Sequence, residues 1–481
     1  MKTFLSAWAV SCCLILSGLA QERVPPNIIY ILADDLGYGD LSCLGQEKFE
    51  TPHIDALKAK GMFFSEHYSG STVCAPSRSA LMTGQHTGHT FVRGNQEVQP
   101  EGQHPLPDEE LLLPEMLKAA GYISGAFGKW GLGFPGSEGD PLNQGFDVFF
   151  GYNCQRLGHH YYPYHLWDND RKVMLEANAG AAKGTYAPEL IHERTLKFIE
   201  DNRTRPFFCY VASIIPHAEL AAPAEYMARF SGRFPEPKPY KGYDEGKEFR
   251  TGPYQSQMEP RTAFAAMVTL LDDQVGEIVA KTEELGIADR TLIIFTSDNG
   301  AHQEGGADPD FFDSNGSYRG HKRDLYEGGI HVPMIAYWPG SIAAGSTSDH
   351  ISAFWDMVPT FTELAGVPTP GTIDGISMVP TLLGKDKQPA HKYLYWEFHE
   401  RDGRMAVRMG KWKGVRYNVL SHPDRPMELY DLSMDPAEEN NIAAEHPETA
   451  AQIRTIMGSA RSESEIFRFG QQKAEKTTQI Q

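Results

Sequence analysis

Three continuous apolar runs dominate the pattern of hydrophobic and polar positions along the chain. They span residues 27–33, 207–215 and 292–296 and are rich in β-branched and aromatic side chains. Runs of this length without polar alternation are typical of strands buried on both faces of a parallel sheet.

Helical spacing separates these runs. Apolar residues recur three and four positions apart over residues 112–120, 189–201 and 264–285. Strands that alternate with helices favour an α/β fold, here a large, mainly parallel sheet flanked by helices. Residues 223–254 are rich in Pro, Gly and charge with little periodicity, and we expect a long surface excursion there.

The pattern changes after about residue 384. Residues 393–398 and 404–415 predict short antiparallel strands, and residues 447–459 predict a terminal helix. These elements indicate a small C-terminal subdomain. The expected organisation is a signal peptide (1–20), a main domain (21–384), a C-terminal α/β subdomain (385–466) and a disordered tail (467–481).

The first 20 residues have the features of a secretory signal. Lys2 precedes an apolar run, and Gly18 and Ala20 are small residues at positions −3 and −1 of a cut before Gln21. The alternative is an uncleaved membrane anchor, but the run is short for a span. We expect a cleaved, secreted or periplasmic protein that is not attached to a membrane.

Charge and cysteine content narrow the class of partner. The net charge is −19, and it becomes −20 when the signal peptide leaves with Lys2, its one charged residue. Such a charge argues against nucleic acid and anionic membranes as partners. Four cysteines remain in a chain of this length, which is too few for a disulfide framework. An anionic ligand would need a locally positive site.

Polar side chains follow the apolar runs. Asp34 and Asp35 close the first run, His217 follows the second, and Asp298 and Asn299 follow the third. Ligands of doubly wound sheets bind beyond the carboxyl ends of the strands. The carboxylate and amide oxygens suit a hard cation such as Ca²⁺ or Mg²⁺ rather than zinc. An isolated Asp-Asp pair is more often a turn or cap, but two acidic strand ends in one sheet favour a metal site.

The sharpest local motif is CAPSR at residues 74–78, continued by SALMTG at 79–84. It resembles the C-x-P-S-R sequence at which formylglycine-dependent (type I) sulfatases, in the alkaline-phosphatase-like superfamily, have their cysteine oxidised. The resemblance covers nearly all of the mature chain and extends to secreted bacterial carbohydrate sulfatases. The structural alternative is a buried cysteine before a helix that has proline in its first turn.

The resemblance implies hydrolysis of sulfate monoesters, with Cys74 converted to 3-oxoalanine (formylglycine) by a formylglycine-generating enzyme of the host. The hydrated aldehyde has two hydroxyls: one can attack sulfur, and the other can expel sulfate by re-forming the aldehyde. The resemblance also implies a Ca²⁺ shell, with Mg²⁺ the less favoured ion, and suggests Asp298 as a proton acceptor for the attack. The implied ligands are Asp34, Asp35, Asp298, Asn299 and the modified Cys74.

Lys129 lies in GKWGLG at residues 128–133, which resembles the family's G-K-W-H-L-G segment. The glycines allow close backbone approach, and the lysine would neutralise sulfate; the alternative is a solvated loop lysine. Gly131 stands where the family usually has a histidine that is thought to help release sulfate. This departure implies another group for that step, and His302 is a candidate.

Two further residues complete the implied catalytic set of Cys74, Arg78, Lys129, His217 and Lys322. His217 resembles the family's histidine at the scissile oxygen, although a structural histidine at a strand end is the alternative. Lys322 lies five residues before Glu327 and matches the spacing of a second sulfate-binding lysine. His217 or Lys322 could protonate the leaving alcohol, and the sequence does not choose between them.

Substrate specificity is less readable. Residues 152–167 are crowded with aromatic and histidine side chains, which stack on sugar rings or pack as an ordinary surface loop. The segment GKWGLG followed by NQGFD resembles relatives that act on galactose-type sugars, which suggests galactose or N-acetylgalactosamine sulfate. The candidate substrate-binding residues are Arg93, His160, Tyr161, His302 and His399.

Three alternatives remain open. A phosphonate or phosphate-ester hydrolase shares the C-x-P-x-R nucleophile. A non-catalytic protein that binds sulfated glycans would retain the pocket without the chemistry, and Gly131 gives that alternative slight support. A two-zinc phosphatase on the same fold is disfavoured by the cysteine nucleophile and by the lack of a histidine-rich metal set.

Overall fold

The computed structural model describes residues 25–245 and 254–468. The expected signal peptide (1–20) lies outside the described residues, and so does the expected tail from residue 469 onward. Within the described part of the chain, no helix combines the length and apolar character needed to cross a membrane.

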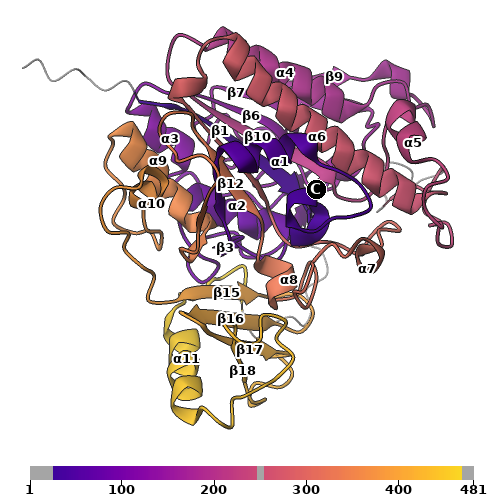
Figure 1. The fold of residues 1–481 in the computed structure, drawn as a ribbon. Coiled ribbons are helices and arrows are strands. Elements are labelled where there is room, and N and C mark those ends of the chain that lie inside the picture. Colours follow the sequence, from indigo (N-terminus) through magenta and orange to yellow (C-terminus); the bar gives the residue numbers. More distant parts are fainter. Residues whose placement is uncertain (1–24, 246–253, 469–481) are drawn as a thin grey trace, which may run out of the picture.

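A ten-stranded sheet forms the centre of the molecule (Figure 1). Its five central strands are mutually parallel, in the order β11, β1, β10, β6 and β7. They are β11 (Thr291–Ser297), β1 (Asn27–Asp34), β10 (Phe207–Pro216), β6 (Ile123–Lys129) and β7 (Val148–Tyr152). The predicted mainly parallel α/β fold is therefore confirmed, with strands β1, β10 and β11 at the three apolar runs.

Strands in antiparallel pairing extend both edges of this parallel centre, except that the outermost strand β13 pairs with β2 in parallel. On one side β12, β2 and β13 follow β11, and on the other side β8 and β9 follow β7. Their bounds are β12 (Met334–Tyr337), β2 (Met62–Phe64), β13 (Ser346–Ser348), β8 (His165–Asp168) and β9 (Arg171–Met174).

Alternate residues of β1 face two different cores. Ile29 and Ile31 pack in the cluster that α1, α4 and α6 cover, whereas Ile28 and Tyr30 pack in the cluster covered by α2, α3 and α9. Both faces of a central strand are thus buried, which explains the absence of polar alternation in its sequence. The helices are α1 (Pro52–Lys60), α2 (Cys74–Thr83), α3 (Leu113–Lys118), α4 (Ala187–Asp201), α6 (Pro260–Glu284) and α9 (Met357–Ala365).

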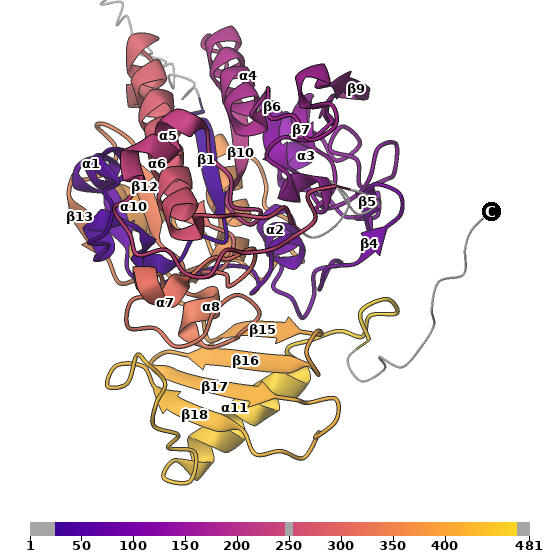
Figure 2. The same ribbon diagram turned by 90° about the vertical axis from the view of Figure 1, so that its right-hand side faces the viewer.

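The C-terminal region forms a separate four-stranded antiparallel sheet, with α11 lying across one face (Figure 2). The short antiparallel strands expected at 393–398 and 404–415 are confirmed, and Gly410, at φ 58°, turns the chain between β16 and β17. A left-handed residue at this point is compatible with a tight turn and not with a continuous strand. The elements are β15 (Leu394–Phe398), β16 (Arg404–Met409), β17 (Trp412–Tyr417), β18 (Glu428–Asp431) and α11 (Pro447–Ser459).

The expected excursion at 223–254 is wrong in part, because its first described residues form a helix, α5. Phe230 is buried from this helix against the core that α6 covers, so tertiary packing compensates for weak periodicity. The remaining helices and strands are short: α5 (Ala224–Phe230), α7 (Pro309–Phe312), α8 (Glu327–Ile330), α10 (Val379–Leu383), β3 (His67–Tyr68), β4 (Glu97–Val98), β5 (Gly102–Gln103) and β14 (Ser352–Ala353).

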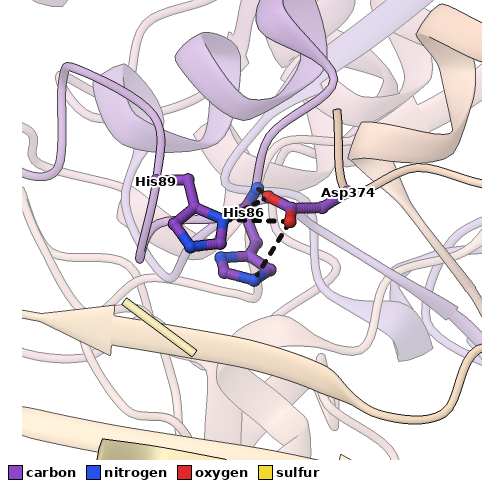
Figure 3. Close-up of side chains that lie close together, drawn as sticks. All are labelled: His86, His89 and Asp374. Carbon is purple, nitrogen blue, oxygen red and sulfur yellow. Dashed lines mark hydrogen bonds and ion pairs between the residues drawn. The ribbon is translucent and has the colours of Figure 1, made fainter. Parts of the chain in front are cut away.

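A histidine–aspartate clasp ties the turn after α2 to the segment that follows α9 (Figure 3). Asp374 accepts a hydrogen bond from the backbone N–H of His86 at 3.0 Å, and His89 Nδ1 lies 2.9 Å from its Oδ1. His86 Nδ1 accepts from the N–H of Gly88 at 3.1 Å, so the neutral ring carries its hydrogen on Nε2, 3.5 Å from Asp374. The two rings also stack on each other, with 4.5 Å between their centroids.

The clasp predicts a pH-dependent contribution to stability. Burial lowers the pKa of His86 to about 4, from 6.5. The unfolded chain therefore binds the proton more readily, and stability is full above about pH 6.5 and lost as the pH falls toward 4. This single group contributes about 3 kcal/mol to that loss.

Replacing His86 with Asn retains an acceptor for Gly88 but removes the titrating group. We expect urea unfolding of His86→Asn to show a shallower loss of stability between pH 6.5 and 4 than the wild-type chain. The exposed Glu109→Ala variant should keep the wild-type slope. Parallel slopes for wild type and His86→Asn would contradict the assignment.

Candidate active site

Nine of the residues expected to carry chemistry come together at one edge of the large sheet. The parallel registers place Asp34 beside Pro216 and Ala33 beside Ser297, so the carboxyl ends of β1, β10 and β11 are level. All nine are at most 5% exposed. They are Asp34, Asp35, Cys74, Arg78, Lys129, His217, Asp298, Asn299 and Lys322.

Arg78 and Lys129 bind the first group of carboxylates. Arg78 donates from Nε and Nη2 to Asp298 Oδ2 at 3.2 and 2.9 Å, and its Nη1 donates to the Lys129 carbonyl. Lys129 Nζ donates to Asp34 Oδ2 at 2.7 Å. Burial opposes both charges, but the pairing lowers the pKa of Asp34 and raises that of Lys129. Both side chains are therefore held in their ionised forms.

Lys322 binds the second group. Its Nζ donates to Asp35 Oδ2 at 2.8 Å and to Glu304 Oε2 at 3.1 Å, and it lies 3.0 Å from His217 Nε2. His217 Nδ1 contacts the Ala218 carbonyl, which only accepts, so Nδ1 carries the hydrogen and Nε2 accepts from Lys322. Burial, and then Lys322, lower the pKa of His217. The proton of this pair therefore sits on the lysine.

Cys74 begins α2, with its side chain turned into this cluster. Its thiol donates to Gln155 Oε1 at 2.9 Å and lies 3.9 Å from Asn95 Oδ1. Burial raises the pKa of the Cys74 thiol, although Lys129 opposes the rise. The first turn of a helix presents free backbone N–H groups and a positive dipole end, so an anion at this point is stabilised.

Two residues of the site were missed by the sequence reasoning. Glu304 bonds Lys322 and pairs with Arg323 at 2.5 Å, and Gln155 bonds Cys74. Glu304 comes six residues after Asp298 in an irregular segment that carries no motif. Gln155 lies inside the aromatic loop that was expected to contact substrate. Its place in that loop only weakly indicated a role in the site, and a glutamine side chain does not by itself indicate catalysis.

The acidic cluster has the features of a site for a hard dication. Asp34 Oδ1 and Asn299 Oδ1 are buried and have no hydrogen-bond partner among the described residues. Asn299 Nδ2 donates to Asp35 Oδ1 at 2.7 Å, which turns its own oxygen toward the same region. Burial, and then Asp34, raise the pKa of Asp298 to about 7, although Arg78 opposes the rise. Oxygen donors of this kind fit Ca²⁺ or Mg²⁺.

The candidate substrate residues lie at three different places in the structure. Tyr161 is fully buried, and the one hydrogen of its hydroxyl is shared between the carbonyl oxygens of Ile214 and His217, at 2.6 and 2.8 Å from the hydroxyl oxygen. His160 Nδ1 lies 3.1 Å from Glu219. These contacts hold the loop that carries His217, so both side chains support the site through the backbone.

Arg93 and His399 meet at a buried carboxylate instead. Arg93 Nη1 donates to Glu397 Oε1 at 3.2 Å, and His399 Nε2 lies 3.0 Å from the same oxygen. His302 is closer to the chemistry, but its Nδ1 accepts from the N–H of Glu304 and its Nε2 lies 3.1 Å from the Pro216 carbonyl. Its two nitrogens are thus used by the backbone, which leaves its expected role at Cys74 without a supporting contact.

Comparison with known proteins supplies the family. The sulfatase family model matches residues 26–367, and the model for the C-terminal region of N-sulphoglucosamine sulphohydrolase matches residues 316–462. Human arylsulfatase A is 34% identical over 89% of this chain and 85% of its own length. Mouse N-acetylgalactosamine-6-sulfatase is 33% identical over 83% of this chain and 74% of its own length.

Solved structures agree with this assignment. The crystal structure of Ps i-CgsB in complex with k-i-k-neocarrahexaose superimposes with a TM-score of 0.76. It is 26% identical in sequence and covers 93% of this chain and 95% of its own.

The unpartnered oxygens at the acidic cluster predict that a divalent cation stabilises the fold. A protein freed of metal with a chelator should melt at a lower temperature than the same protein in calcium. A free calcium concentration of about 100 times Kd would add roughly 3 kcal/mol to the free energy of unfolding. Thermal melts with chelator, Ca²⁺ and Mg²⁺ measure this shift.

A matched pair of variants locates the ion. Asn299→Ala removes one of the unpartnered oxygens and should lose most of the calcium shift. Asp374→Asn alters the histidine–aspartate clasp and should retain the calcium-dependent rise in melting temperature. A shift that survives Asn299→Ala and disappears in Asp374→Asn would place the ion at the clasp instead.

Proposed function

The chain belongs to the sulfatase family, and from that premise we propose a secreted hydrolase of sulfated carbohydrates. In this proposal it acts with a formylglycine made from Cys74 and with bound Ca²⁺. The observation that carries the proposal is the position of Cys74. Its side chain lies at the start of α2, inside a buried group of three cations and three carboxylates at the strand ends.

Charge explains how an acidic protein would accept an anionic ester. Arg78, Lys129 and Lys322 are fixed by the carboxylates at their sides, so their positions are set before any substrate arrives. Preorganised cations of this kind stabilise charge that develops on a transferring group. A dication bound at the unpartnered oxygens of Asp34 and Asn299 would add positive charge next to the ester and polarise a bound oxyanion.

Lys322 and His217 have different roles in the proposed proton transfer. Lys322 holds a proton between Asp35 and Glu304, while His217 accepts from it. This arrangement supports Lys322 as the group that protonates the leaving alcohol, with His217 orienting the ammonium. The aldehyde form of residue 74, once produced by a maturation enzyme, supplies the nucleophile as its hydrate.

The substrate class rests on the relatives. One is named for N-acetylgalactosamine-6-sulfate, and one similar structure was solved in complex with a neocarrahexaose. These names support a sulfated sugar of the galactose type. The aromatic loop next to the site, with His159 stacked on His217 at 4.6 Å between centroids, would provide a surface for a sugar ring.

The nucleophile can be tested directly. In a host that converts such motifs, we expect the peptide across Cys74 to carry an aldehyde and the protein to release sulfate from a chromogenic aryl sulfate. Cys74→Ala should fold with a wild-type Tm and lose sulfate release altogether. Mass spectrometry of the peptide and a sulfate assay measure the two results. Full activity of Cys74→Ala would refute the nucleophile.

The assignment of the leaving-group proton predicts a dependence on substrate. Lys322→Ala should lower kcat/KM by about 100-fold or more on a sulfated sugar, whose alkoxide needs a proton. The loss should be smaller on nitrophenyl sulfate, because that leaving group departs without one. Equal losses on both substrates would show that Lys322 binds sulfate but does not protonate the alcohol. Lys411→Ala, at a half-exposed lysine next to β17, is the control.

A further inference from the structure

Gln155 is the residue bonded most closely to the side chain of Cys74. It is 4% exposed, and its Oε1 accepts from the Cys74 thiol at 2.9 Å. Its Nε2 is buried and unpartnered among the described residues. A buried amide with one unused donor costs free energy unless a ligand or a modified neighbour uses it. One half of this amide is therefore available to such a partner.

Gly131 makes room for the amide. The glycine has φ 78°, and a Cβ built there would lie 2.4 Å from Gln155 Nε2 and 2.9 Å from Gln155 Cδ. A side chain at position 131 and the present position of Gln155 are therefore mutually exclusive. The glycine at position 131 is therefore what allows the Gln155 amide to reach Cys74.

The backbone explains why Gln155 arrives at this point. β6 and β7 pair in parallel up to Lys129 and Tyr152, and the two chains stay bonded beyond the strands. Trp130 N–H donates to the Tyr152 carbonyl at 2.9 Å, and Gly131 N–H donates to the Asn153 carbonyl at 3.2 Å. The loop from β7 is thus held directly over Gly131, which carries Gln155 to the start of α2.

We propose that Gln155 is the positioning residue for the nucleophile, taking the space that a side chain at residue 131 would otherwise fill. The inference rests on the proposed function, because the thiol sulfur of Cys74 stands in for an oxygen of the mature residue. Oε1 would accept from one hydroxyl of that residue, and Nε2 would donate to an oxygen beside it. An amide neither gains nor loses a proton near neutral pH, so Gln155 orients the hydroxyl and takes no proton from it.

The kinetic test replaces the amide by side chains of similar volume. Gln155→Leu should lower kcat on nitrophenyl sulfate on the order of 100-fold, with KM changed far less, because a misplaced nucleophile slows chemistry more than binding. Gln155→Glu should regain activity as the pH falls. A protonated carboxyl donates and accepts as the amide does, whereas the carboxylate only accepts and repels the anionic ester.

The matched control is Gln144→Leu. Gln144 is 1% exposed and bonds the Glu138 carbonyl at 2.8 Å, away from residue 74. This variant should keep the wild-type kcat and pH profile. Each preparation is compared per mole of aldehyde at residue 74, so that incomplete maturation is not mistaken for slow chemistry.

A second measurement is independent of activity. Thermal melts of wild type, Gly131→Ala, Gln155→Ala and the double variant form a cycle that isolates the coupling of the two positions. Gly131→Ala should lower the Tm strongly in the wild-type background and less in Gln155→Ala, because only the first contains the amide beside the new methyl. An equal fall in Tm in both backgrounds would contradict the inference that residue 131 and Gln155 compete for the same space.

The outcomes separate the inference from its premise. An active wild type whose Gln155→Leu variant matches it in kcat, at equal aldehyde content, would overturn the positioning role alone. A wild type that carries no aldehyde and releases no sulfate would overturn the proposed function and this inference with it. A pH-independent loss in Gln155→Glu, equal to that of Gln155→Leu, would also count against the amide's donor and acceptor role.

Discussion

The rest of the structure depends on keeping three carboxylates and three cations buried together at the ends of parallel strands. Burying each charge alone would cost several kcal/mol, so the positions are tolerable only as a network. Asp34 illustrates the constraint, because one of its oxygens is bonded to Lys129 at 2.7 Å while the other has no partner among the described residues. The cations are thus fully paired, whereas acceptor oxygens are left over that could bind a dication.

Much of this site could be predicted from the sequence, for a physical reason. The apolar runs before Asp34, His217 and Asp298 must lie inside the sheet, and parallel pairing then brings their ends to one edge. The family motif supplied Cys74 and Arg78, which no periodicity reveals. Prediction was less successful where the chain leaves the sheet: helix α5 depends on tertiary packing that local patterns do not encode.

The substrate candidates show a different limit. Histidine, tyrosine and arginine near a motif suggest a sugar site, yet the hydroxyl of Tyr161 is bonded to the carbonyls of Ile214 and His217. Residue type indicates what a side chain can bond, whereas burial and the nearest acceptors determine what it does bond. Glu304 shows the opposite case, because an ordinary glutamate in an irregular segment becomes a partner of Lys322 only through folding.

Gly131 shows why a departure from a family motif is weak evidence for lost activity. In the sequence, position 131 has no side chain. In the structure, the space that a side chain there would fill contains the amide of Gln155, which comes from the loop after β7. The exchange changes the chemistry as well as the source: an amide can hold a hydroxyl by donor and acceptor together, but it carries no ionisable proton. Any proton that leaves residue 74 must then pass to another group, and the nearest ionisable side chains are those of the buried network. In the proposed mechanism, Asp298 and its neighbours would therefore have to accept the proton that a histidine at residue 131 could otherwise take.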